Sequence, residues 1–484
     1  MVRLFCLSFY VLEFGNLRNL RIGMETRLSK DQVSFAAHDL LLLIIAFLGI
    51  FVYGLLAALP GSVLPTLERN QYLPNDSAVA TFLLINAVGA VMAYAVSGPI
   101  IDRIGKKFGL LFGTAMVVAS MAGFFLTVTR VQAASALLLI FACSLTLGLG
   151  ANAIVAAGHA LVADVASSWR NAALNLLDIC FGLGLASLPL VVQRLQQAGG
   201  LGLIFSSLGV AAVILLVLVL ASRFPQPTHP ESSPITEAPA LFRNPSFLLL
   251  AMSLFMYVGT EVSVGKWVVT FMERDPHILA SQGLSAADLQ TLAHSSSDLL
   301  SRFFETDPLG YAVASYALST LTLFAIALLG GRLVSSFLLG IVRLNSFVLM
   351  TAGSALTTAS LFIAFTASTA GTVRLGLILA GFGMGPIFPT SVGLASVMIP
   401  RIAGTAMSLV MGIGFAGLLL IPPAVGYVSN AVGGAAGNVR TGLMTVIAAS
   451  VIMLVLHVLL TFRERRRSFL SESALERNAT GEAI

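Results

Sequence analysis

The sequence predicts an all-α membrane protein with twelve transmembrane helices in two pseudo-symmetric six-helix bundles. Three observations carry this prediction: 57% of the residues are hydrophobic and only 10% are charged, long apolar stretches recur, and the second half repeats features of the first. A soluble domain carries about 25% charged residues, because its surface must face water. The mean hydropathy of +0.93 is incompatible with such a surface, so most of the exterior must face lipid.

Apolar stretches of sufficient length occur twelve times along the chain, since a span needs about 20 mostly apolar residues. Pro386, Pro389, Pro422 and Pro423 predict kinks in the tenth and eleventh of them. We expect the spans at 40–66, 78–101, 108–129, 134–163, 172–193, 201–223, 245–272, 309–331, 344–368, 373–398, 403–429 and 440–462.

Positive charges mark the cytoplasmic side of a membrane protein. If both termini are cytoplasmic, 19 Lys and Arg residues fall in cytoplasmic segments, Arg332 among them, and seven fall in external loops. This asymmetry predicts that both termini are cytoplasmic, which requires an even number of spans. Arg outnumbers Lys 23 to 4, which is typical of a GC-rich bacterial genome and indicates the inner membrane of a bacterium.

The second to fifth predicted spans align with the eighth to eleventh without gaps at an offset of 233 residues. The aligned pairs include Gly98 with Gly331, Gly148 with Gly381, Gly184 with Gly417 and Pro189 with Pro422, and a smaller offset places Tyr53 opposite Tyr257. Chance coincidence in a Gly-rich chain is the alternative explanation. A segment rich in Pro, Ser and Thr (224–240) separates the halves and predicts a flexible linker. We expect a cytoplasmic leader at 1–39, bundles at 40–223 and 245–462, a linker at 224–244 and a cytoplasmic tail at 463–484.

The segment GPIIDRIGKK (98–107) resembles the loop signature between the second and third helices of the major facilitator superfamily (MFS). The resemblance implies a gating role for this loop. Asp102, at the inner end of the second helix, would face the positive N-terminal end of the eleventh helix and latch the cytoplasmic side shut. Anchoring by positive charges alone is the alternative. The matching residues are Gly98, Asp102, Arg103, Gly105, Lys106 and Lys107.

Three further segments resemble helices five, seven and ten of the fucose–proton symporter group of sugar transporters: 173–190, 257–271 and 381–390. This resemblance implies the MFS fold, with a monosaccharide bound between the halves near the bilayer midplane. It also implies a proton, or sodium, as the coupling ion. The chain departs from the group because the span at 40–66 has no embedded acid and the fourth span has none before Asp164. The coupling residues of the group therefore do not transfer to this chain.

Glu261 lies near the middle of the seventh span, where an ionisable group costs about 2.5–3.5 kcal/mol and is a functional candidate by default. Tyr257 lies one turn earlier on the same helix face. We expect Glu261 to accept hydrogen bonds from sugar hydroxyls and to carry a proton. The alternative is an ion pair with Lys266, which would require a helix break near Gly265 and would involve Lys266 in coupling. Trp267 could stack on a sugar ring or anchor the helix at the outer interface.

A second pair of candidates for proton coupling is Asp178 and His159, on the antiparallel helices five and four. We expect them to meet and to relay a proton, because His titrates near physiological pH. A structural lock, or no contact at all, is the alternative. Asn152, Asn175 and Asn86 are polar residues in neighbouring spans that could bind sugar hydroxyls, although hydrogen bonding between helices explains them equally well.

Three functions remain open on the sequence alone. The first is import of a monosaccharide by proton symport through alternating access. The second is proton-coupled export of a drug or metabolite, and the third is a non-transporting nutrient receptor on the same scaffold. We expect no enzyme, no metal and no cofactor besides the coupling ion, because the sequence has neither a nucleophile–base constellation nor paired cysteines. The expected partners are a sugar and membrane lipid, with no nucleic acid, and the expected state is a monomer.

Overall fold

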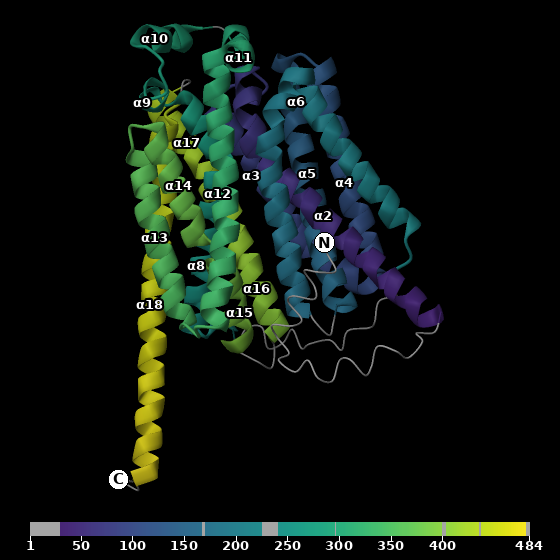
Figure 1. The fold of residues 1–484 in the computed structure, drawn as a ribbon, viewed down its shortest axis with the longest axis vertical. Coiled ribbons are helices and arrows are strands. Elements are labelled where there is room, and N and C mark those ends of the chain that lie inside the picture. The colour runs from purple at the N-terminus through teal and green to yellow at the C-terminus, as the bar shows by residue number, and fades with distance from the viewer. Residues whose placement is uncertain are drawn as a thin grey trace.

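The computed structural model describes residues 30–166, 170–224, 241–295, 297–398, 403–434 and 437–480. These residues form helices and connecting turns, and no strand occurs among them. Most helices run in the same general direction and lie side by side in one bundle (Figure 1). The order of the helices along the chain follows the predicted spans closely.

The described part of the first half contains five long helices by continuous hydrogen bonding. One of them is two spans. The 52-residue α6 would be about 78 Å long if straight, which is far more than a bilayer of about 30 Å requires. At Gly199 and Gly200 the backbone leaves the helical conformation, with φ of +62° at Gly200, and the two arms meet at the top of the bundle (Figure 1). The helices are α2 (Lys30–Arg69), α3 (Asp76–Ile104), α4 (Lys106–Arg130), α5 (Ala133–Val165) and α6 (Arg170–Ala221).

Two predicted spans of the second half are each divided. The tenth breaks on either side of Pro386 and the eleventh breaks before Pro422, as the proline positions predict. The helices are α8 (Pro245–Arg274), α9 (Pro276–Ala280), α10 (Ala286–His294), α11 (Ser297–Thr306), α12 (Pro308–Gly340), α13 (Ser346–Thr366), α14 (Ala370–Met384), α15 (Ile387–Met398), α16 (Ala403–Ala416), η4 (Gly417–Leu419), α17 (Ile421–Gly433) and α18 (Val439–Thr480).

Eleven helices of the described residues are long and apolar enough to cross a membrane, and α6 supplies the arms of two spans. With the two arms of α6 counted separately, the spans number twelve among the described residues, which confirms the prediction. The leader (1–39) and the linker (224–244) stay predictions, because most of each, 1–29 and 225–240, lies outside the described residues. Near the ends of the chain, α2 already begins at Lys30 and α18 continues to Thr480, beyond the predicted limits of 40 and 462.

The internal repeat is visible in how glycines pack. Gly148 of α5 lies against the backbone of α3 at Asn86, and Gly381 of α14 lies against the backbone of α12 at Phe324. The glycines 184 and 417 make the same kind of contact in the two halves, with the backbones at residues 51 and 255. A side chain at any of these positions would hold the paired helices apart. These matched contacts support a common origin of the two bundles better than chance coincidence does.

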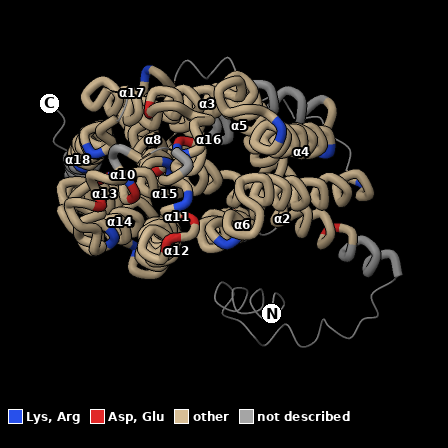
Figure 2. Tube along the Cα trace, turned by 90° about the horizontal axis from the view of Figure 1, so that it is seen from above, with Lys and Arg blue, Asp and Glu red and all other residues tan. Residues whose placement is uncertain are grey.

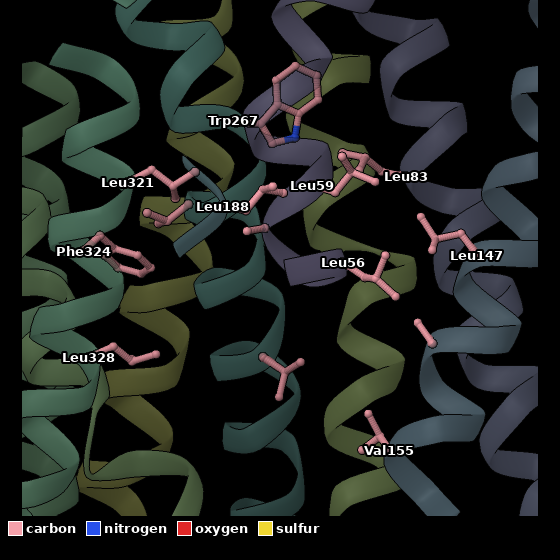
Figure 3. Packing of buried hydrophobic residues seen from close by; sticks show 14 of the residues in the cluster. Leu56, Leu59, Leu83, Leu147, Val155, Leu188, Trp267, Leu321, Phe324 and Leu328 are labelled. Carbon is pink, nitrogen blue, oxygen red and sulfur yellow. The ribbon is translucent and has the colours of Figure 1, made fainter. Parts of the chain in front are cut away.

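Apolar side chains hold the two bundles together through one continuous core. In it α12 packs on α6, α17 packs on α3, and α8 packs on α2. Leu59 of α2, Leu188 of α6 and Leu321 of α12 lie in this core, all less than 3% exposed (Figure 3).

Three short helices, α9 to α11, form an insert between α8 and α12 at the end of the bundle where α2 ends and α3 begins (Figure 1). The positive charges predict that this end is extracellular, and we call it the outer end. A separate apolar cluster, which includes Leu279, Phe304 and Val313, holds the insert on α12. The insert also reaches the end of α2: the Phe304 ring lies 4.6 Å from the Arg69 guanidinium, and the Ser301 hydroxyl donates to Oδ1 of Asn70, just after α2, at 2.8 Å.

Candidate functional site

Four ionisable or polar side chains from both halves interact within the bundle. Glu261 and Tyr257 come from α8, Arg332 comes from α12, and Asp178 comes from α6 of the other half. Glu261 interacts electrostatically with Arg332 and with Asp178, and Arg332 also interacts with Asp178. Together with His159 we call these residues the central polar cluster. Its charged groups include one guanidinium and two carboxylates, and the two carboxylates belong to different halves of the molecule.

His159 and Asp178 meet, as the sequence predicts. His159 Nε2 lies 3.8 Å from Asp178 Oδ1, an ion-pair distance that is too long for a direct hydrogen bond. On the other side of the ring, Nδ1 lies 2.9 Å from the carbonyl oxygen of Val155. Oxygen atoms therefore face both ring nitrogens, and a proton added at Nε2 would face a carboxylate. About a third of each side chain is exposed, 34% for His159 and 36% for Asp178. The role of the pair in coupling stays a prediction.

Arg332 is the residue of this cluster that sequence reasoning missed. The predicted span ended at 331 and left Arg332 in a cytoplasmic loop, but α12 continues to Gly340. That assignment was wrong because a single Arg interrupts an apolar run that resumes at once in LVSSFLLG (333–340). The continuation of the run past Arg332 is the signal that could have identified it. The correction lowers the predicted cytoplasmic count from 19 to 18 and leaves the predicted orientation unchanged.

Two polar atoms of the cluster are buried and make no hydrogen bond within 3.5 Å among the described residues: Arg332 Nε, and Tyr257 Oη, which still interacts with the side chains of Glu261 and Arg332. Buried polar atoms are normally satisfied by protein, water or ligand. Tyr257 is fully buried, whereas Glu261 and Arg332 are partly exposed. The cluster therefore offers a donor and a hydroxyl that a bound hydroxylated solute could satisfy.

Lys266 does not form the ion pair with Glu261 that the sequence left open. Its ammonium group donates to the carbonyl oxygen of Ala57 in α2 at 2.8 Å, and no carboxylate among the described residues pairs with it. The helix break near Gly265 that such an ion pair would require is absent, since α8 is continuous from Pro245 to Arg274. Lys266 thus joins α8 to α2 across the two halves and stands apart from the central polar cluster. Its role in coupling remains a prediction.

Trp267 occupies neither of its two predicted environments. Its ring is fully buried, and the indole N–H donates to the carbonyl oxygen of Pro422 in α17 at 2.9 Å. Figure 3 shows the ring among apolar side chains of the core. It is therefore not free to stack on a solute and not placed at the membrane interface. Helical periodicity put Trp267 on α8 correctly but did not reveal that this face packs against α17.

The asparagine candidates make structural bonds where they are described. Asn152 is buried and donates to the carbonyl oxygen of Gly148 in its own helix at 2.8 Å. Asn86 of α3 donates to the carbonyl oxygen of Ser144 in α5 at 3.0 Å, which ties two helices together. The Asn86 bond is the kind of bond between helices that the alternative interpretation describes, and a role of Asn86 or Asn152 in solute binding stays a prediction. The side chain of Asn175 lies outside the described residues.

The loop signature is described only in part. α3 runs through Gly98, Asp102 and Arg103, but their side chains lie outside the described residues, so the latch formed by Asp102 stays a prediction. Gly105 separates α3 from α4 with φ of +106°, a conformation that favours glycine. Lys106 then begins α4 and forms an ion pair with Asp164 near the end of α5.

A second charged network lies at the outer end and was not predicted as a site. It joins the first half to the second through the Arg69–Glu273 ion pair and through Arg274, which binds both Glu68 and Asp76. Figure 2, viewed from above, shows charges of both signs gathered where α8 approaches α3. Charged residues cluster at the ends of the first and seventh spans, and this clustering could have pointed to the network. The sequence does not show which of these charges pair with each other.

A small pocket lies beside this network at the outer end. It has about 10 Å³ of free space, close to the minimum that one water molecule occupies. Its walls come from both halves, and they do not include Glu261, Asp178 or Arg332. The lining residues are Ser62, Pro65, Thr66, Arg69, Gln193, Gln196, Gln197, Glu273, Phe304, Glu305, Ala314 and Leu318.

The profile of the Major Facilitator Superfamily matches residues 46–287, which is half of the chain. The chain belongs to this family. It is therefore a membrane transporter by family and not an enzyme. A curated relative, "Bypass of stop codon protein 6" of Saccharomyces cerevisiae, is 23% identical over 423 residues, which cover 81% of this chain and 77% of the relative.

Solved structures of transporters share the fold at low sequence identity. The crystal structure of a D-xylose-proton symporter has a TM-score of 0.65 at 14% identity and covers 86% of this chain and 97% of its own. That of the nucleoside transporter NupG has a TM-score of 0.64 at 14% identity and covers 87% and 98%. A bacterial homologue of the human lysosomal transporter Spinster has 0.64 at 15% identity and covers 90% and 98%. At these identities the likeness establishes the fold alone.

Proposed function

We propose that this protein is a secondary active transporter that imports a monosaccharide by proton symport, with the central polar cluster as its site. One observation carries the proposal. Asp178 of the first half and Glu261 of the second half both interact electrostatically with the guanidinium of Arg332, inside a membrane-spanning bundle. Ionisable groups in spans are rare and mark solute or proton pathways.

The chemistry of the cluster suits a hydroxylated solute. Carboxylates accept hydrogen bonds from hydroxyl groups, and the guanidinium and the tyrosine hydroxyl donate them. Tyr257 Oη and Arg332 Nε make no hydrogen bond within 3.5 Å among the described residues. A sugar bound here would satisfy both. Two of the structural neighbours are a D-xylose-proton symporter and a nucleoside transporter. The solutes of those two proteins also carry hydroxyl groups, which is consistent with a hydroxylated solute here.

The charges of the cluster suggest how a proton couples to movement of the halves. With His159 neutral, two carboxylates and one guanidinium leave one excess negative charge, which a proton on Glu261, Asp178 or His159 would cancel. Protonation of Glu261 would leave Arg332 to pair with Asp178, its partner on the opposite half. The contact between Arg332 and Asp178, which joins the two halves, would then become stronger. A stronger contact at the central polar cluster would favour one of the two conformations, open to the outside or open to the inside. The proton and the solute would in this way select the same conformation.

The experiment that tests the proposal is uptake by proteoliposomes. Labelled hexoses, pentoses and nucleosides are offered with and without an inside-alkaline pH gradient. We expect one sugar class to accumulate only with the gradient, and Glu261→Gln and Asp178→Asn to abolish accumulation. Asp288→Asn is the matched control, because Asp288 is an exposed carboxylate that caps α10 far from the cluster.

Two results would overturn the proposal. If sugars accumulate equally without a gradient and in both cluster variants, proton symport through the cluster is wrong. If solutes other than sugars compete best, or if a proton gradient drives solute out of the vesicles, the protein is instead a carrier or exporter of another class of metabolite.

A further inference from the structure

Glu68 and Asp76 of the first half are bound by the same guanidinium of the second half. Arg274 Nη1 donates to Asp76 Oδ1 at 2.5 Å and lies 3.2 Å from Glu68 Oε1. Asp76 is fully buried in its side chain, and that of Glu68 is 11% exposed. These contacts span the interface that must open if solute is to reach the bundle from the outer end.

Asp76 is well stabilised as an anion in this arrangement. Besides Arg274 it accepts a hydrogen bond from the Ser429 hydroxyl of α17. It also lies in the first turn of α3, where the positive end of the helix dipole favours a carboxylate. Its negative charge is therefore compensated from three directions.

Glu68 is poorly stabilised as an anion by comparison. Its bond to Arg274 is the longer of the two, and Glu68 Oε2 is buried with no hydrogen-bond partner among the described residues. Asp76 lies close enough to repel it electrostatically, and Arg69 attracts it but is committed to Glu273. An unpaired buried carboxylate oxygen is costly, and a proton would remove that cost.

The charges around Glu68 do not balance. In the ion pairs described for this region four carboxylates face three guanidinium groups, and Glu305 of α11, which lines the pocket beside Arg69 and Glu273, adds a fifth carboxylate. The groups of the ion pairs are Glu68 and Arg69 of α2, Asp76 of α3, Glu273 and Arg274 of α8, Asp275 before α9, and Arg440 of α18, which binds Asp275 at 2.6 Å.

We propose that Glu68 is a proton-operated latch of the outer end. It holds a proton while the outer end is closed and releases it to the outside when the halves separate and water reaches it. The state that binds more protons is favoured as the pH falls. External acidity therefore closes the outer end, and external alkalinity opens it. Arg274 of the second half binds both Glu68 and Asp76 of the first half. Closure of the outer end brings these three groups together, so closure and protonation of Glu68 occur together.

The latch proton differs from the proton of the central polar cluster. It is taken from the outside and returned to the outside, so it regulates the conformational cycle and is not carried across. Glu68→Gln mimics the protonated side chain. It should remove the dependence of outer closure on external pH and leave the number of protons moved per solute unchanged.

The test measures the distance between the halves at the outer end without any solute. Spin labels are placed at Ala198 and Ser368, which are exposed residues of the two halves outside the network, in a chain whose three cysteines are replaced. Distance distributions are recorded from about pH 5 to about pH 8. One linked proton changes the ratio of closed to open molecules by up to about tenfold per pH unit.

We expect the wild-type closed population to fall as the pH rises and Glu68→Gln to stay closed throughout. Glu305→Gln is the matched control, because Glu305 is an acid at the outer end whose carboxylate accepts only a hydrogen bond from Gln196 in the described contacts. It should keep the wild-type pH dependence. A wild-type distribution that does not change with pH overturns the proposal, whatever the variant does. An unaltered pH dependence in Glu68→Gln also overturns it.

Discussion

Gly61 of α2 and Gly265 of α8 meet backbone to backbone at the interface between the two halves. A Cβ atom at Gly61 would overlap the carbonyl oxygen of Gly265, whereas a Cβ atom at Gly265 would find open space within 4 Å. One residue along α8, Lys266 donates to Ala57 of α2 at 2.8 Å. The two helices thus close on each other through a steric contact and one hydrogen bond, next to the charged network of the outer end.

Gly61→Ala should prevent full closure of this crossing. Packed interiors do not absorb an overlap of this size without moving the helices apart. We expect solute uptake to fall by about tenfold or more and the outer end to become more accessible. Uptake rates and labelling of an outer-end cysteine by a membrane-impermeant reagent check this. Gly265→Ala is the matched control and should transport normally; equal losses in both variants would contradict the steric argument.

Arg332→Ala should abolish transport, because it leaves Glu261 and Asp178 facing each other without the guanidinium. Adding Glu261→Gln to Arg332→Ala removes one of the two carboxylates and should restore part of the solute binding, but not the proton coupling. Solute binding by calorimetry and gradient-driven uptake separate these effects. The exposed loop residue Arg223 gives the control, since Arg223→Ala should behave as wild type. If the double variant binds no better than Arg332→Ala, the charge balance of the cluster is not what matters.

Trp267→Phe should lower thermal stability and leave solute affinity intact. The change removes the hydrogen bond to Pro422 and part of the packing in the core, and a hydrogen bond inside a membrane protein contributes about 1 kcal/mol. The melting temperature with and without solute, and the KM for uptake, check this. A KM raised several-fold with unchanged stability would instead favour stacking of the ring on the solute.

Much of the fold could be predicted because the constraints on it are local. Lipid requires long apolar helices, and Pro386 and Pro422 fix the breaks in two of them. The internal repeat also aligned Gly148 with Gly381, and in the structure these two glycines make equivalent close contacts in the two bundles. Even the meeting of His159 with Asp178 followed from the antiparallel course of two adjacent spans.

The contacts of the site residues depend on which helices pack against each other. The local sequence patterns used for the prediction do not give that packing. Trp267 lay on the correct helix, but its partner Pro422 is 155 residues away. The carboxylates that share Arg274 are about 200 residues from it, at positions 198 and 206 residues earlier. Arg332 was missed for a different reason: one charge in an apolar run marks a helix end as often as a functional site.

The most direct test of the central polar cluster is proton uptake driven by solute. Proteoliposomes that hold a pH indicator receive the transported sugar at equal pH on both sides. If the account is correct, sugar acidifies the lumen in wild type and in Asp288→Asn, and fails to do so in Glu261→Gln although the variant still binds sugar. Acidification by Glu261→Gln at the wild-type rate would contradict the assignment of Glu261 as the proton carrier.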